Sequence, residues 1–166
     1  MKILFLCTAN SCRSILAEAL FNQLAPAGMR AFSAGSEPRG EINPLTLEAL
    51  ARAGIAADGL YSKSSDAHQA LNPDFVITVC DKAAGEACPV QFGPATKAHW
   101  GLADPSESVG SPEEIKAAFD ATLVRLKLRF TAFHRVSRAT ARSAGCRYAE
   151  NRAGAHRHTL NLAGHA

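Results

Sequence analysis

A cysteine and an arginine near the amino terminus are separated by five residues, where an apolar run gives way to a helical pattern. The segment reads Cys7-Thr8-Ala9-Asn10-Ser11-Cys12-Arg13-Ser14. The apolar run before it, residues 3–6, is typical of a buried parallel strand. Apolar residues after it recur at helical spacing, at positions 15, 16, 19, 20 and 24. The pattern predicts a strand, a loop and a helix in direct succession.

Such a junction points free backbone N–H groups and the positive end of a helix dipole at one place, which suits a tetrahedral oxyanion. The predicted oxyanion-binding residues are Thr8, Ala9, Asn10, Ser11, Cys12, Arg13 and Ser14. Arg13 can add a bidentate clamp, and Ser14 can donate a hydrogen bond to a Cys7 thiolate. We expect the same field to lower the pKa of Cys7 and make it a nucleophile. The alternative is a buried structural cysteine before an ordinary helix.

Strands and helices alternate along the first 133 residues. Strands are predicted at about 2–7, 29–33, 74–79 and 95–99, and helices at about 13–25, at about 44–53 and from about 111 onward. This order predicts an α/β fold, a three-layer sandwich with a four-stranded parallel sheet and helices on both faces. Residues 134–166 are rich in Arg, Ala and His and lack an apolar face, so we expect a separate, flexible tail.

Charge is distributed unevenly between these two parts. Residues 1–133 hold 12 Lys and Arg against 14 Asp and Glu, whereas residues 134–166 hold six Arg and one Glu. The body therefore has no basic stripe, and we expect no binding of nucleic acid. No segment has the length of a membrane span, and no secretory signal is recognisable. Five cysteines do not form the even framework of a secreted scaffold, so a cytoplasmic location is predicted.

Three further motifs accompany the loop. They are Ser33-Ala34-Gly35 after the second strand, Val79-Cys80-Asp81 with Cys88-Pro89 after the third, and the segment His99 to Pro105 after the fourth. Together with the loop, they resemble the low-molecular-weight protein tyrosine phosphatase superfamily, and within it the thiol-relay, thioredoxin-coupled arsenate reductases. The resemblance covers about residues 1–133.

This resemblance implies a reaction and a substrate. Cys7 would attack arsenate, for which phosphate or sulfate is an analogue, while Arg13 holds it. Asp104 lies in an Ala-Asp-Pro turn at the same predicted sheet edge as Cys7 and would act as general acid. Cys80 and then Cys88 would relay a disulfide to thioredoxin or another thiol reductant. Inert buried thiols or a zinc site are the alternatives for these two cysteines.

The resemblance also implies a possible potassium site at Asn10, Glu18, Ser33 and Asp66, with no cofactor required. Cys12 matches a loop position that is not the nucleophile, and we interpret it as an auxiliary thiol open to oxidation. Two other functions stay open. A phosphatase of phosphotyrosine or small phosphoesters would use the same loop and acid but has no need of Cys80 and Cys88. A non-catalytic oxyanion-binding module would need neither a nucleophile nor an acid.

Overall fold

The computed structural model describes residues 1–80 and 92–158, with side chains described as far as residue 137. It divides into two units, Met1–Lys127 and Leu128–Ala166. A four-stranded parallel sheet forms the centre of the first unit, in the order β2-β1-β3-β4. Its strands are β1 (Lys2–Cys7), β2 (Arg30–Gly35), β3 (Phe75–Thr78) and β4 (Thr96–His99). The predicted parallel sheet is confirmed, and its strands lie where the sequence predicts them.

The sheet order places β1 in the interior, with β2 on one side and β3 on the other. The chain therefore leaves β1 toward one neighbour and later returns to its opposite side. Ligands of open α/β sheets bind outside the carboxyl ends of the strands at such a point. The loop from Thr8 to Cys12 follows β1 there, so the topology alone assigns it the ligand-binding edge.

Alternate residues of β1 build two cores. Ile3 and Phe5 are fully buried, and the Phe5 ring lies 6.0 Å from that of Phe21 on α1 (Arg13–Leu24). Leu4 and Leu6 point to the opposite face, as the twofold period of a strand requires, and pack with Val76. A strand that is apolar on both faces must be covered on both faces.

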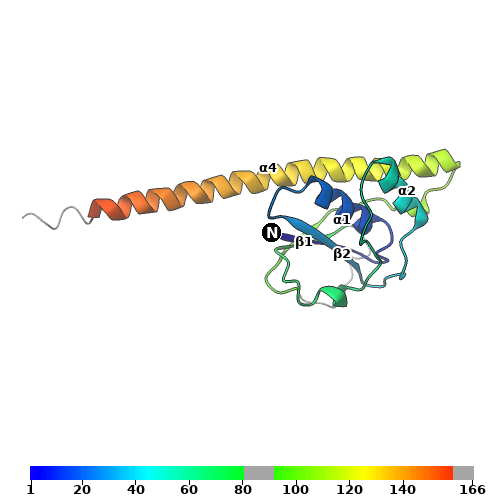
Figure 1. Cartoon of the computed structure of the whole chain (residues 1–166), viewed down its shortest axis with the longest axis horizontal. Coiled ribbons are helices and arrows are strands. Elements are labelled where there is room, and N and C mark those ends of the chain that lie inside the picture. Colours follow the sequence, from blue (N-terminus) through cyan, green and yellow to red (C-terminus); the bar gives the residue numbers. More distant parts are fainter. Residues whose placement is uncertain (81–91, 159–166) are drawn as a thin grey trace, which may run out of the picture. The chain divides into compact units, whose positions relative to one another are not determined.

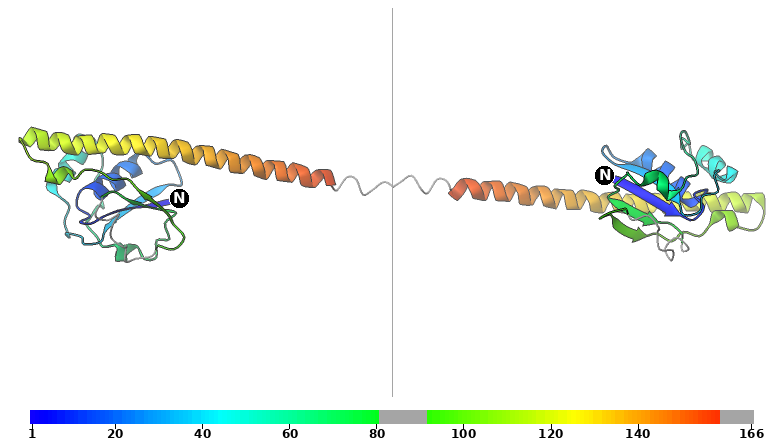
Figure 2. Two further views of the ribbon diagram at one scale, coloured as in Figure 1. Left: turned by 180° about the vertical axis from the view of Figure 1, so that it is seen from behind. Right: turned by 90° about the horizontal axis from the view of Figure 1, so that it is seen from below.

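Helices provide that cover. α1 and α2 (Pro44–Arg52) lie on one side of the sheet, and the short helix η1 (Ser65–His68) lies on the other (Figures 1 and 2). The Asn43 side chain caps α2 by accepting from the Leu45 N–H, with Pro44 in the first turn. A second short helix, η2 (Pro105–Glu107), follows β4.

The last helix, α4 (Pro112–His158), has 47 residues and continues past position 133, where the sequence predicts a boundary. Its backbone hydrogen bonds need no apolar face, so the loss of that pattern does not end the helix. The flexibility of residues 134–166 stays a prediction. No helix in the described ranges combines the length and the apolar character that crossing a membrane requires.

Candidate active site

Cys7 ends β1 with its thiol buried beneath the loop that follows. Its Sγ lies 2.9 Å from Ser14 Oγ and accepts a hydrogen bond from the Asn10 backbone N–H at 3.1 Å. Both contacts follow from the predicted strand–loop–helix junction, because the loop turns back over the end of its own strand. The sulfur is therefore held at the base of the loop, where an oxyanion bound by the loop would meet it.

Burial raises the pKa of the Cys7 thiol above its ordinary value, while the hydrogen bonds from Ser14 and Asn10 lower it by less. The lowered pKa expected from the sequence is therefore wrong for this state of the site. The physical reason is that the guanidinium of Arg13, which could stabilise a thiolate, is paired elsewhere. Desolvation of the sulfur then outweighs the two hydrogen bonds.

Arg13 and Asp104 form a short ion pair across the site. Arg13 Nη2 lies 2.6 Å from Asp104 Oδ2, and Nη1 donates to the Leu102 carbonyl at 3.0 Å. Both side chains are about one-sixth exposed, at 16% and 18%. The second oxygen of Asp104 accepts from the Ser106 N–H and hydroxyl, which fixes the carboxylate at the start of η2. The structure thus brings together Cys7, Arg13 and Asp104, as the sequence predicts.

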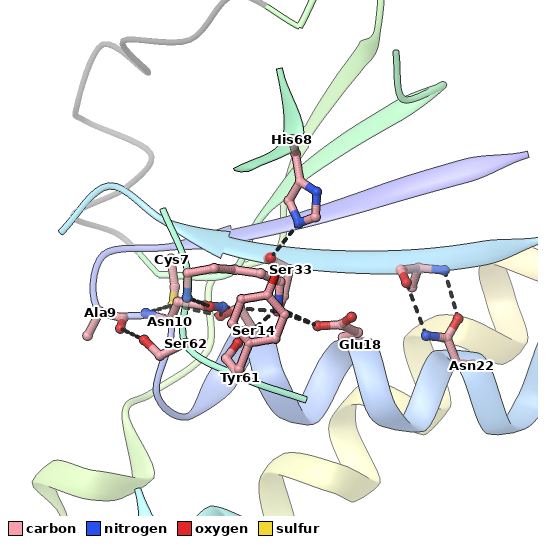
Figure 3. A network of polar contacts seen from close by, with 12 residues as sticks. Cys7, Ala9, Asn10, Ser14, Glu18, Asn22, Ser33, Tyr61, Ser62 and His68 are labelled. Atoms are coloured by element: carbon pink, nitrogen blue, oxygen red, sulfur yellow. Dashed lines mark hydrogen bonds and ion pairs between the residues drawn. The ribbon is translucent and has the colours of Figure 1, made fainter. Parts of the chain in front are cut away.

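Asn10 holds the loop in shape. Its φ of 42° lies in the left-handed region, which asparagine tolerates better than most residues. Its Oδ1 accepts from the Lys63 N–H, and its Nδ2 donates to the hydroxyls of Ser14 and Ser33. Figure 3 shows this amide between the loop, α1 and β2. The loop conformation therefore depends on three other parts of the chain.

A cavity of about 30 Å³ opens beside Cys7, and two residues that the sequence analysis did not single out line it. These two residues are Arg39 and Ser106, and the predicted residues Arg13 and Asp104 line the same cavity. Arg39 brings a second guanidinium to the site, and its backbone N–H donates to the Ala9 carbonyl. The signal that could have found Arg39 is its place after Gly35, at the same edge of the sheet. A larger cavity of about 320 Å³, between α1, α2 and α4, shares none of these residues.

Cys80 follows β3 and lies beside the loop. Its thiol is buried, and its Sγ is 3.6 Å from the Thr8 hydroxyl. Parallel pairing of β1 with β3 brings the two cysteine-bearing strand ends to one edge. Cys88, the other predicted relay cysteine, lies outside the described residues, so its place in the site stays a prediction.

Cys12 occupies the N-cap position of α1, at the end of the loop, but its side chain makes no capping hydrogen bond. Burial raises the pKa of this thiol to about 12. A buried, protonated thiol is a poor target for oxidants, because the thiolate is the reactive form. The interpretation of Cys12 as an oxidation-prone thiol is therefore not supported, although the residue lies in the loop between β1 and α1, as predicted.

The four residues of the predicted potassium site do not assemble into one cation cradle. Asn10 Oδ1 accepts from the Lys63 N–H, and Glu18 Oε2 accepts from Ser33 and receives the Lys63 ammonium at 3.4 Å. The Asp66 carboxylate accepts from Ser64 and Gln69 in its own turn. These oxygens are committed to protein donors and do not fit a potassium ion. No part of the mechanism below depends on one.

Comparisons with known proteins agree with this geometry. The family model described as low molecular weight phosphotyrosine protein phosphatase matches residues 2–144. An arsenate reductase of Bacillus subtilis is 38% identical over 117 residues, which cover 70% of this chain and 83% of that protein.

Two solved structures extend the likeness. One is the thioredoxin-dependent arsenate reductase of Corynebacterium glutamicum, with 29% identity and a TM-score of 0.57, covering 79% of this chain and 62% of that one. The other is an arsenate reductase in a phosphate-binding state, with 25% identity and a TM-score of 0.63, covering 79% and 97%. The parallel sheet and the matched sequence agree. This chain belongs to the low molecular weight phosphotyrosine protein phosphatase family, alongside relatives named arsenate reductase.

Proposed function

We propose that this protein is an arsenate reductase that works through a Cys7–Cys80–Cys88 thiol relay. The observation that carries the proposal is the second buried thiol at the oxyanion loop, Cys80, with its Sγ 3.6 Å from Thr8. Hydrolysis of a phosphoester needs one cysteine, whereas reduction of arsenic needs a second thiol to accept the oxidation. The relatives named arsenate reductase support the same conclusion.

The first step would place arsenate on the loop N–H groups and draw Arg13 away from Asp104. The guanidinium then stabilises the Cys7 thiolate, and the proton that the thiol loses passes to the Asp104 carboxylate, which no longer pairs with Arg13. The thiolate attacks arsenic, a sulfur–arsenic bond forms, and an As–O bond breaks. Asp104 gives its proton to the departing oxygen, which leaves as water.

Reduction would follow by attack of one thiol on another. The Cys80 thiolate attacks Sγ of Cys7, a disulfide forms, and the sulfur–arsenic bond breaks. Its electron pair stays on arsenic, so As(V) becomes As(III) and arsenite leaves. Cys88 then attacks Sγ of Cys80 and frees Cys7. A thiol reductant returns the Cys80–Cys88 disulfide to two thiols, and thioredoxin is our first candidate since the Corynebacterium relative is thioredoxin-dependent.

Within this proposal the protein acts in the cytoplasm, where thioredoxin and reduced thiols are available. No cofactor is required, since the electrons come from the thiols themselves. The runner-up function is a tyrosine or small-phosphoester phosphatase, which the family model favours. The two share Cys7, Arg13 and Asp104, so weak hydrolysis of aryl phosphates is expected even from a reductase.

Cys80→Ser separates the two functions. The variant should lose arsenate-dependent oxidation of NADPH in the presence of thioredoxin and thioredoxin reductase, yet hydrolyse an aryl phosphate within about twofold of wild type, a difference of about 0.4 kcal/mol. Cys146→Ser, which changes a cysteine outside the proposed relay, is the matched control. Normal arsenate reduction by Cys80→Ser would exclude the relay. Efficient aryl phosphate hydrolysis by the wild type, with no arsenate reduction from any thiol donor, would establish the phosphatase instead.

A further inference from the structure

Lys63 carries a buried ammonium group that the catalytic steps above do not use. The residue is 7% exposed, although lysine is among the residues least often buried. Its Nζ donates to the Tyr61 carbonyl at 2.9 Å, lies 3.4 Å from Glu18 Oε2 and sits 4.4 Å from the centre of the Tyr61 ring. A carbonyl, a carboxylate and the face of an aromatic ring surround this ammonium group, and such partners offset the cost of burying a charge.

Hydrogen bonds lead from this ammonium group to the nucleophile. Glu18 Oε2 accepts from Ser33 Oγ, which accepts from Asn10 Nδ2. The same Asn10 nitrogen donates to Ser14 Oγ, which contacts Cys7 Sγ. Figure 3 shows the line of side chains from Glu18 through Ser33, Asn10 and Ser14 toward Cys7.

The orientation of the Asn10 amide indicates the proton directions along this line. Asn10 Oδ1 accepts from the Lys63 backbone N–H, so the amide nitrogen must face the two serines. That nitrogen occupies an acceptor site on each serine oxygen, which leaves each hydroxyl proton free to point onward. Ser33 therefore donates to Glu18, and Ser14 donates to Cys7. A serine that donates to sulfur favours the thiolate over the thiol.

Within this line of hydrogen bonds, the Glu18 carboxylate is the group that needs a positively charged partner. Its side chain is only 12% exposed, and an unpaired buried carboxylate would take up a proton or turn toward water. A proton would weaken Glu18 as the acceptor of Ser33, and turning toward water would remove that acceptor, so either change would loosen Asn10. His68 also packs nearby and donates from Nε2 to the Ser33 carbonyl at 3.0 Å, but burial lowers its pKa, so it is neutral at neutral pH. Lys63 is the positive charge paired with Glu18.

We propose that the Lys63 ammonium group serves as a built-in monovalent cation that holds the Glu18–Ser33–Asn10–Ser14 line in register, so that the enzyme does not need potassium. Lys63 is then a positioning residue, because it touches neither substrate nor the reacting sulfur. The activity readout rests on the proposed function, whereas the titration of Cys7 does not.

The test compares wild type, Lys63→Ala and Lys63→Arg, with Lys97→Ala as an exposed-lysine control. The reactivity of Cys7 toward iodoacetamide is followed against pH, and arsenate reduction is followed as kcat and KM. Each is measured in potassium chloride and in N-methylglucamine chloride of equal ionic strength. Wild type and Lys97→Ala should show the same values in both salts.

Lys63→Ala should raise the pKa of Cys7 by about one unit, a tenfold loss of thiolate at a given pH. Potassium, entering the space that the side chain leaves, should reverse the shift and restore kcat, whereas N-methylglucamine should not. Lys63→Arg should stay near wild type. If no protein, wild type included, reduces arsenate, but Lys63→Ala still raises the pKa of Cys7 and potassium still reverses that rise, the proposed function is overturned. This inference is then still supported.

Two results would overturn the inference. One is potassium dependence of the wild type, seen in kcat, in the pKa of Cys7 or in the melting temperature. The other is a Lys63→Ala protein whose Cys7 titrates as in wild type or does not respond to potassium. If Lys63→Ala does not fold, the potassium dependence of the wild type alone decides whether the inference holds.

Discussion

The charge states of the residues in this site depend on which anion the Arg13 guanidinium contacts. Arg13 is paired with Asp104, and burial raises the pKa of the Cys7 thiol, so the resting site favours the protonated sulfur. An oxyanion changes that balance, because it is the better partner for the loop N–H groups and for a guanidinium. The site is therefore expected to become reactive when the substrate arrives.

Asp104→Asn tests this competition. Removing the carboxylate frees Arg13 and takes a negative charge from the site, so the pKa of Cys7 should fall. Turnover of arsenate should nevertheless fall by about 10²- to 10⁴-fold, since the general acid is lost. A pH titration of the thiolate absorbance measures the first effect, and steady-state kinetics measure the second. A rise in the pKa of Cys7 would contradict the assigned role of the ion pair.

Arg39 is expected to attract the anion rather than to take part in the chemistry. The residue lines the cavity but is exposed, so its charge is screened by solvent. Arg39→Gln should raise KM for arsenate about twofold to fivefold, as up to about 1 kcal/mol would give, with little change in kcat. Arg30→Gln, at the opposite end of β2, is the control. A loss confined to kcat would place Arg39 in the chemical step instead.

At the scale of elements, contacts between the ends of the strands and the loop after β1 determine the geometry of the site. The predicted strands and helices agree with the structure because apolar periodicity is local, as residues 3–6 and the stripe on α1 show. Contacts such as Lys63 with Glu18, or Arg39 with the cavity, join segments far apart in the chain and leave no local pattern. The pKa of Cys7 differs from the sequence prediction because burial of the sulfur beneath the loop, which no local pattern shows, raises it.

Gly35 at the end of β2 illustrates such a fit. A Cβ there would lie 2.4 Å from the Thr8 carbonyl oxygen and 3.0 Å from the Asn10 nitrogen, both in the loop backbone. Gly35→Ala should therefore displace the loop, cost about 1–3 kcal/mol of stability and weaken phosphate binding strongly. Gly54→Ala is the contrast, because Gly54 has a φ of 67° and open space around it. That change should cost stability through backbone strain and leave phosphate binding intact, as calorimetry can measure.

Asn22 ties α1 to the edge strand β2. Its amide donates to the Ala31 carbonyl and accepts from the Ala31 N–H, at 3.0 and 2.8 Å (Figure 3). Two hydrogen bonds of about 0.5–1.5 kcal/mol each predict a loss of about 1–3 kcal/mol for Asn22→Ala. The neighbouring Gln23→Ala should be close to neutral. Thermal unfolding of both variants checks the difference, and equal melting temperatures would mean that the clamp contributes nothing.

At the scale of the whole molecule, the chain carries its site within one unit. The described site residues, from Cys7 to Ser106, belong to Met1–Lys127, whereas the basic surplus lies in residues 134–166. The helical backbone of α4 continues between the two parts, yet a continuous helix does not by itself couple them. Function and the carboxyl-terminal segment should therefore be separable.

Removing residues 135–166 tests that separation. The truncated chain keeps every residue of the proposed relay and of the line from Lys63 to Cys7, so kcat and KM for arsenate should stay near those of the full chain. The melting temperature should change by less than about 4 °C, which corresponds to about 1 kcal/mol for a chain of this size. Insoluble protein or a larger fall would show that the segment stabilises the folded domain. A different outcome would assign the segment to docking of the reductant: the truncated chain keeps its stability and its activity with a small dithiol, but loses its activity when thioredoxin is the reductant.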